Sequence, residues 1–393
     1  MNKYLCFMKK ILYVASNDFN KYGGGRQAVR AYLDSVLEIF GGEYVDVLSG
    51  TEYVPLEEYK DLNYIKYSKR SRFISYKEVL LKGYLERWST AILNHLKTHL
   101  SEYEMIIING GANGSVIPQL KKLGLKVATI HHNEEVEYTM DNKSMTTFGG
   151  RWYYLIRKAQ KLAYKYSDVN LFLTFQDRDS LEKMYGNNCK INEVLGVYDY
   201  KSAYKIIPSL KKRPFYQISI SGSLSDYQTV HGIMDINKNY FDIIDSEIPG
   251  FKMLLTGRNP SYEVLDFANN HKGNVEIVAN PIDILSVVQK GIIYLCPTDI
   301  GGGLKLRVMD GLKSGMPILV HAISARGYEM FKEKPYFRVY SDRESFKQGL
   351  LDLLLYIQNS SAISYKQICE DFYSFFSYEI GTERMRRFLL SKQ

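Results

Sequence analysis

A short stretch around residues 301–310 brings together glycines, two cations and a carboxylate in an order that suits phosphate binding. Three consecutive glycines, residues 301–303, stand between an apolar strand and a helix. Glycines let the backbone approach a ligand closely, and the first amides of a helix offer unpaired donors with partial positive charge. Lys305 and Arg307 add formal charge where a diphosphate would lie, and Asp310 offers a carboxylate to ribose hydroxyls. This order favours a nucleoside-diphosphate site over a flexible turn followed by an ordinary surface helix.

Two histidines, His131 and His132, end another apolar strand in the first half of the chain. Together with Glu134 and Glu135 they form a group of metal-ligand types. Such close neighbours rarely converge on one ion without spaced partners, so no metal site is expected here. The DxD at residues 177–179 has the form of a metal-binding pair, but it follows a strand and begins a helix, so helix capping explains it better. Neither a metal nor another cofactor is therefore expected.

The elements that must position these residues alternate between short apolar strands and amphipathic helices, which is typical of parallel α/β sheets. The first strand is followed by Gly23, Gly24 and Gly25, and then by a helix with one apolar face. In open sheets of this kind, ligands lie beyond the carboxyl ends of the strands. The predicted strands are residues 11–15, 44–48, 105–109, 126–130, 169–174, 216–221, 252–256, 275–278, 291–297 and 317–320.

The alternation of strands and helices restarts in the middle of the chain. Residues 205–214 are charged, contain two prolines and are typical of a linker. The strand that follows ends at a glycine turn, as the first strand of the chain does. We therefore predict an α/β protein with two doubly wound, Rossmann-like domains that face a cleft. The first domain is predicted at residues 1–205 and the second at 206–372, with a last helix at 373–393.

The composition excludes several classes of protein. The 393 residues suffice for two domains with their own cores, and the net charge of +8 is spread along the chain. Because no aromatic–basic RNA-binding signature occurs, nucleic acid is not expected as a partner. The four scattered cysteines form no CxxC pair and favour a reducing compartment. The motifs GxSxG and GxxxxGKS/T are both absent, which excludes the common serine-hydrolase and P-loop sites.

The sequence favours a cytoplasmic protein. No apolar run approaches the ~18 residues that a membrane span requires. Lys9 and Lys10 interrupt the apolar start of the chain, so no signal peptide is expected, and residues 1–7 are interpreted as an extension. Residues 66–72 are rich in cations, and together with residues 76–88, which follow, they mix cations with apolar side chains. This segment is compatible with peripheral contact to the inner face of an anionic membrane, and equally with a solvated helix face.

The stretch with the three glycines resembles the donor-binding element of retaining glycosyltransferases of the GT-B fold, the group 1 family. In that element a glycine-rich turn is followed by two basic residues with one residue between them. Two apolar residues, a Glu and an Ala come next, and a Gly-x-Pro follows shortly afterwards. Lys305 and Arg307 match the basic pair in this sequence. Asp310 replaces the usual Glu, and Gly311 replaces the usual Ala. Gly302 occupies the position of a first Glu that many members carry.

The resemblance extends to further strand ends and implies a set of donor-binding residues. Where some members place an Arg and a Lys in the second domain, this chain has Ser223 and His231. The glycines after the first strand resemble the family's loop that approaches donor phosphate and acceptor. This loop is not GxGxxG, since Ala28 stands at the third glycine position, so a dinucleotide site is disfavoured. The implied donor nucleotide and diphosphate ligands are Gly24, Gly25, Gly222, Ser223, Arg258, Gly302, Gly303, Leu304, Lys305, Arg307 and Asp310.

The resemblance also implies a catalytic residue and a reaction. The strand before His131 resembles the one where the family places an active-site His, so His131 is expected beside the transferred sugar, with His132 pointing elsewhere. The implied reaction moves a sugar from a nucleoside-diphosphate sugar, without a metal and with retention of anomeric configuration. The acceptor would be a saccharide, glycolipid or glycoprotein in surface polysaccharide or glycoconjugate synthesis. The last helix is expected to cross back onto the first domain.

Two alternatives stay open. A nucleotide-sugar epimerase shares the two-domain fold and would turn over the donor with no acceptor. A catalytically silent sugar-nucleotide-binding or scaffold subunit would bind the nucleotide without turnover, and Gly302 and Asp310 are compatible with it. The sequence identifies neither the sugar, nor the base of the nucleotide, nor the acceptor.

Overall fold

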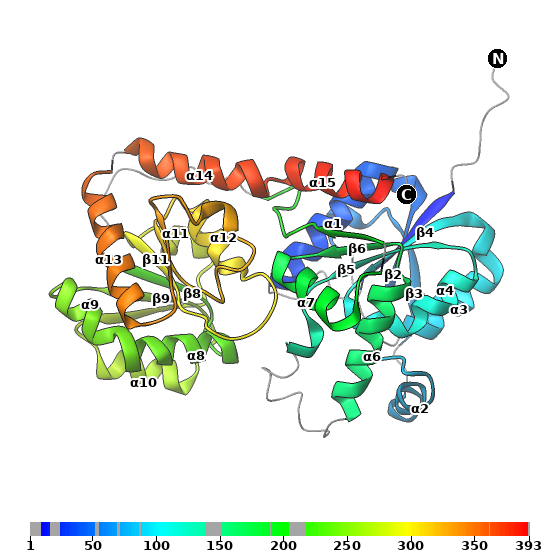
Figure 1. The fold of residues 1–393 in the computed structure, drawn as a ribbon, viewed down its shortest axis with the longest axis horizontal. Coiled ribbons are helices and arrows are strands. Elements are labelled where there is room, and N and C mark those ends of the chain that lie inside the picture. The colour runs from blue at the N-terminus through cyan, green and yellow to red at the C-terminus, as the bar shows by residue number, and fades with distance from the viewer. Residues whose placement is uncertain are drawn as a thin grey trace, which may run out of the picture. The chain divides into compact units, whose positions relative to one another are not determined.

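The computed structural model describes residues 9–15, 24–51, 55–68, 71–85, 88–137, 151–188, 190–203, 217–360 and 362–391. The chain divides into two compact units: one comprises Met1–Ala203 and Phe376–Gln393, and the other comprises Tyr204–Phe375. The predicted linker at residues 205–214, the predicted extension at 1–7 and Gly23 lie outside the described residues. Each unit is built around one sheet with helices packed on it (Figure 1).

The first unit contains a seven-stranded parallel sheet in the order β3-β2-β1-β4-β5-β6-β7. The strand order reverses between β1 and β4, which makes the sheet doubly wound, as predicted. Apolar side chains of β1, β4 and β5 are fully buried and form the centre of the core. The strands are β1 (Lys10–Val14), β2 (Val45–Gly50), β3 (Asn63–Tyr67), β4 (Tyr103–Asn109), β5 (Lys126–His131), β6 (Val169–Phe172) and β7 (Ile191–Val194).

The helices of the first unit follow from the 3.6-residue spacing of apolar side chains. Helix α1 (Gly24–Phe40) buries Ala28, Val29, Tyr32 and Val36, whose spacing places them on one side of the helix. The other helices are α2 (Arg72–Lys82), α3 (Trp88–His99), α4 (Ile117–Lys122), α6 (Arg151–Tyr166), α7 (Phe175–Tyr185) and α15 (Tyr378–Leu390), with short 3₁₀ turns η1 (Gly42–Tyr44), η2 (Glu57–Tyr59), η3 (Leu100–Glu102) and η4 (Gly111–Val116).

The end of the chain packs within the first unit, where α15 lies against α1. The Ser35 hydroxyl makes hydrogen bonds to the Thr382 hydroxyl at 2.8 Å and to the Tyr198 hydroxyl at 2.9 Å. A Cβ at Gly381 would lie 2.0 Å from the Tyr198 ring, so only glycine allows this close approach. The final helix, predicted at residues 373–393, begins instead at Tyr378, because Ser377 caps the start of α15 and residues 373–376 are the end of α14.

The second unit repeats the architecture with a six-stranded parallel sheet in the order β10-β9-β8-β11-β12-β13. Helices α8 and α10 cover one face of this sheet, and α11 and α12 cover the other (Figure 1). The strands are β8 (Ile218–Ser223), β9 (Met253–Arg258), β10 (Val275–Ala279), β11 (Ile293–Cys296), β12 (Ile318–His321) and β13 (Phe337–Tyr340). The helices are α8 (Tyr227–Asp235), the π-helical η6 (Ile236–Tyr240), α9 (Phe241–Glu247), α10 (Tyr262–Asn270), α11 (Ile284–Val288), α12 (Leu306–Lys313), the 3₁₀ turn η7 (Glu329–Phe331), α13 (Arg343–Gln358) and α14 (Ala362–Phe376).

Candidate functional site

The predicted phosphate-binding turn lies at the carboxyl end of β11, in the second unit. Helix α12 begins at Leu306, so residues 301–304 form the loop before it and Lys305 is its N-cap. Gly301 and Gly303 have φ angles of 85° and 72°, a conformation that favours glycine. A Cβ at Gly301 would lie 2.2 Å from Nε2 of Gln228. Glycine is therefore favoured at residues 301 and 303 by backbone conformation, and at 301 also by the close approach of α8.

The side chain of Lys305 folds back and makes hydrogen bonds to this loop. Its Nζ donates to the carbonyl oxygens of Gly301 and Gly302 at 2.8 and 3.0 Å, and to Oε1 of Gln228 at 3.1 Å. The Lys305 carbonyl in turn accepts from the Tyr328 hydroxyl at 2.9 Å. The lysine thus places a positive charge directly behind the glycine loop and holds the loop in one conformation.

Arg307 lies in the first turn of α12 and reaches the ends of two strands. Its Nη1 donates to Oγ1 of Thr298, the second residue after β11, at 2.8 Å, and its Nη2 lies 3.8 Å from Oδ2 of Asp226. The guanidinium also lies against Gly222 at the end of β8, where a Cβ would be 2.8 Å from Nε. Arg307 therefore joins β8, β11 and α12 at the point where the strand order of this sheet reverses.

Three other predicted donor ligands lie at the ends of β8 and β9. Gly222 pairs with Gly257, and Ser223 pairs with Arg258, in the parallel ladder. A Cβ at Gly257 would lie 1.6 Å from the carbonyl oxygen of Gly222, so the two strands meet through glycine backbone. The Ser223 and Arg258 side chains are exposed at this edge. The structure thus brings Gly222 into contact with Arg307 and places Ser223 and Arg258 on the adjoining strand ends.

Asp310 is half-buried on α12, one turn beyond Arg307. The adjacent Gly311 is packed tightly, since a Cβ there would lie 2.5 Å from Cδ1 of Ile318 and 2.6 Å from the ring of Tyr294. Glycine in place of the family's alanine therefore lets α12 lie unusually close to β11 and β12.

Sequence reasoning did not assign several residues that surround this site. Gln228 and Asp226 come from the start of α8, and Thr298 follows β11. His231 was noted only as a mismatch, yet its Nδ1 lies 2.8 Å from Oδ1 of Asp299. Their common signal is position, because all five lie in the segments that follow the carboxyl ends of the neighbouring strands β8 and β11, from the loop to the second turn of α8.

His131 ends β5 in the first unit, and its side chain is 0% exposed. The ring stacks on Phe172 with centroids 4.9 Å apart, and Nε2 lies 2.9 Å from Oδ1 of Asn170. Because the amide of Asn170 donates elsewhere, its oxygen accepts here and the imidazole proton is assigned to Nε2. Nδ1 has no hydrogen-bond partner among the residues that the structure describes, and it faces Gly111. Burial lowers the pKa of His131 to about 4, so the ring is neutral at pH 7.

His132 points to a different group of side chains. Its Nε2 makes a hydrogen bond with Oδ1 of Asn109, whose amide donates to the Tyr13 hydroxyl at 3.0 Å. The His132 ring meets Tyr32 of α1 edge-on, with centroids 6.2 Å apart. This group joins the carboxyl ends of β1, β4 and β5 to the middle of α1, and the predicted ligands Gly24 and Gly25 are the first two residues of that helix. Desolvation lowers the pKa of His132 to about 4 as well.

The acidic residues considered as metal ligands have structural partners. Glu134 accepts hydrogen bonds from the backbone amides of Val136 and Glu137 at 2.9 and 2.7 Å. Asp177 accepts from the Thr174 hydroxyl, at the N-cap of α7, and from the amide of Glu134. Among the described residues, no three His, Cys, Asp or Glu side chains lie close enough together to hold a metal ion.

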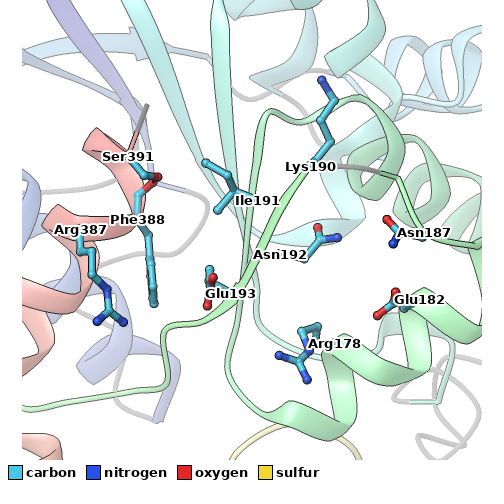
Figure 2. A pocket seen from close by; sticks show the side chains of 10 residues that line it. All are labelled: Arg178, Glu182, Asn187, Lys190, Ile191, Asn192, Glu193, Arg387, Phe388 and Ser391. Atoms are coloured by element: carbon cyan, nitrogen blue, oxygen red, sulfur yellow. Dashed lines mark hydrogen bonds between the residues drawn. The ribbon is translucent and has the colours of Figure 1, made fainter. Parts of the chain in front are cut away.

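A pocket of about 590 Å³ lies elsewhere in the first unit, beside the edge strand β7. Figure 2 shows Arg387 and Phe388 of α15 on one side of this strand, and Arg178 and Glu182 of α7 on the other. None of the predicted site residues lines this pocket. The candidate site is therefore defined by strand ends and not by this pocket.

Comparison with known proteins identifies the fold. No family model matches the sequence, and no curated protein matches it. Among solved structures, the chain is similar to HepE of Anabaena in complex with UDP and glucose, at 13% identity and a TM-score of 0.66, covering 98% of this chain and 100% of that one.

Two further solved structures are similar to this chain over nearly its whole length. The lipopolysaccharide outer core galactosyltransferase WaaB in its apo form is 12% identical with a TM-score of 0.68, covering 98% of this chain and 100% of that one. Sucrose-phosphate synthase of Thermosynechococcus elongatus is 11% identical with a TM-score of 0.67, covering 96% and 97%. With its two doubly wound parallel sheets and this end-to-end similarity, the chain has the GT-B fold.

Proposed function

We propose that this protein is a glycosyltransferase that takes a sugar from a nucleoside-diphosphate sugar, with the diphosphate bound at the carboxyl end of β11. The observation that carries the proposal is the position of two cations, Lys305 and Arg307, at the glycine loop. Lys305 donates hydrogen bonds to the loop carbonyls, and Arg307 donates to Thr298 and packs against Gly222. The similar HepE structures were solved with UDP and glucose and with UDP-glucose, which supports a nucleotide-sugar donor.

The chemistry follows from where negative charge develops. The acceptor hydroxyl oxygen bonds to the anomeric carbon as the bond from that carbon to the diphosphate oxygen breaks. Negative charge grows on the leaving diphosphate, which takes up the hydroxyl proton. Amides of Gly302, Gly303 and Leu304, together with Lys305 and Arg307, stabilise that charge, so the transfer needs no metal. Asp310 anchors the ribose.

His131 is proposed to position the transferred sugar. A neutral imidazole with its proton on Nε2 leaves the Nδ1 lone pair as an acceptor for a sugar hydroxyl. Since the ring is fully buried in this form, a hydroxyl can reach Nδ1 only if the adjoining turn η4 moves. Retention of configuration stays part of the proposal, and no residue is assigned as a nucleophile.

A silent nucleotide-binding subunit is the second candidate. Gly302 stands at the position of a glutamate that many members of the resembled family carry, and His131 has no exposed surface. This candidate predicts nucleotide binding, no transfer of the sugar to any acceptor, and no effect of His131→Asn on that binding. Loss of donor turnover in His131→Asn, with nucleotide affinity retained, would instead favour the transferase.

Lys305→Ala is expected to weaken nucleotide binding at least tenfold, or ~1.4 kcal/mol. The substitution removes a positive charge and also releases the loop carbonyls of Gly301 and Gly302. Calorimetric titration of the wild type and the variant with UDP and with GDP, in EDTA, measures the effect and identifies the base. Lys290→Ala, an exposed lysine of the same unit, is the matched control and should bind as the wild type does. If neither nucleotide binds to the folded wild type, the donor-site assignment is wrong.

A further inference from the structure

Helix α2 of the first unit presents apolar side chains to solvent. Ile74, Leu80 and Leu81 are 49%, 53% and 72% exposed. At 100° per residue they fall, with the exposed Lys77, within one third of the helix circumference. A surface helix of a soluble domain normally turns charged residues outward on this side. Three exposed apolar side chains around one lysine therefore indicate that this side of α2 contacts an apolar partner.

A second apolar surface begins where α2 ends. A pocket of about 520 Å³ is lined by the last residue of α2, by α3 and by the end of α4. Leucine side chains from α3 and the exposed Leu123 contribute apolar surface to it. Between α2 and this pocket, Gly83 ends α2 in a left-handed conformation with φ 69°, and a Cβ there would lie 3.3 Å from Oγ of Ser115. We refer to α2 and this pocket together as the α2 surface.

The charged side chains of this pocket are all basic. Lys82, Lys97 and Lys122 line it, and no acidic residue does. Glu78 of α2 accepts a hydrogen bond from the Thr90 hydroxyl at 2.6 Å and lies 3.7 Å from Lys82, so its charge is partly compensated. Lys97 and Lys122 are exposed, and no ion pair involving either is present among the described residues. The α2 surface thus combines apolar side chains with a net positive charge.

We propose that the α2 surface binds the anionic face of a lipid bilayer. A lipid surface offers apolar chains beside negatively charged headgroups, which is the complement of exposed leucines beside lysines. Each lysine near an anionic membrane adds to the attraction, and the leucines insert at the boundary between headgroups and chains. None of the described helices combines the length and the apolar composition needed to span a membrane, so this contact is peripheral. The proposal does not depend on the donor site, which lies in the other unit.

Co-sedimentation with vesicles tests the proposal. The wild type is expected to bind vesicles that mix phosphatidylglycerol with phosphatidylcholine, to bind pure phosphatidylcholine weakly, and to be released as salt rises. The triple variant Lys82→Glu, Lys97→Glu, Lys122→Glu should lower the partition coefficient about tenfold or more. Leu80→Ser with Leu81→Ser, which changes only exposed side chains, should also lower it while leaving thermal unfolding unchanged.

The matched control carries the same change in charge on the other unit: Lys272→Glu, Lys290→Glu and Lys332→Glu, all exposed. It should bind the anionic vesicles nearly as the wild type does. An equal loss in both triple variants would mean that net charge alone drives binding, and the α2 surface would be ruled out. Failure of the wild type to bind anionic vesicles, or equal binding to neutral ones, would also overturn the proposal. Nucleotide titration of the same variants reports separately on the donor site.

Discussion

Arg307→Ala is expected to weaken binding of the nucleoside diphosphate about 100-fold, or ~2.7 kcal/mol. The guanidinium is pre-positioned by Thr298 at 2.8 Å and by close contact with Gly222, so little side-chain entropy is lost when a phosphate binds. Removing it deletes a charge-assisted donor and also leaves Thr298 without this partner. Calorimetric titration with the nucleotide that the wild type binds measures the effect.

Two comparison variants separate charge from geometry. Arg307→Lys keeps the charge but cannot reach Thr298 and a phosphate together, so an intermediate loss is expected. Gly222→Ala keeps Arg307 but adds a methyl group 2.8 Å from its Nε, at a φ angle of 155° that disfavours other residues, and should also weaken binding. Arg343→Ala removes an exposed arginine paired with Asp242 and should leave binding unchanged. Unchanged binding in Arg307→Ala would contradict the proposed phosphate site.

The sequence predicted the central strands of both sheets but missed three strands at sheet edges. These strands, β3, β7 and β13, each have a neighbour on one side only. No residue of β7 is fully buried, and β3 buries only Tyr67. A central strand must be apolar on both faces, whereas an edge strand that is partly exposed can carry Asn, Lys and Glu. The apolar pattern that identifies buried strands was therefore absent from β3 and β7, whereas β13 buries Phe337 and Tyr340 and this reason does not apply to it.

In the candidate site, the glycine turn and its cations were predictable and their partners were not. Consecutive glycines, a lysine and an arginine are adjacent in sequence, so their spacing alone indicates a turn before a helix. The contact of Lys305 with Gln228 joins residues 77 positions apart, and that of Arg307 with Gly222 depends on the strand order of the sheet. Such contacts follow from the tertiary arrangement, which local patterns do not contain.

The burial of His131 has the same origin. At the end of a strand, the sheet packs against one side of a histidine ring, and the loop that covers the sheet packs against the other side. Here η4 covers the ring, and a Cβ at Gly111 would lie 2.6 Å from Nδ1. The contact with Asn170 comes from the neighbouring strand β6. Position in the sequence predicted that His131 ends a strand, whereas the packing of η4 and β6 against its ring determines that the ring is neutral and enclosed.

The first unit is expected to lose stability as pH falls from about 6.5 to about 4, because of His131. Its pKa in the folded state is about 4, and its ordinary value is 6.5. Between these two values the unfolded chain binds a proton that the folded chain does not, so protonation favours unfolding. Over the whole window this amounts to about 3 kcal/mol for His131. His132 acts in the same direction with a smaller effect, because its side chain is partly exposed.

Urea unfolding of the wild type and of His131→Gln across this pH range isolates the effect from that of carboxylates, which both proteins share. The variant should be less stable at pH 7, since it loses the stacking on Phe172. The difference should shrink as pH falls, because glutamine binds no proton in either state. Imidazole NMR signals of the folded wild type should show the Nε2-protonated form well below pH 6. A folded-state titration near pH 6.5, or parallel stability curves for the two proteins, would mean that water reaches the ring, and the enclosed acceptor at Nδ1 would not exist.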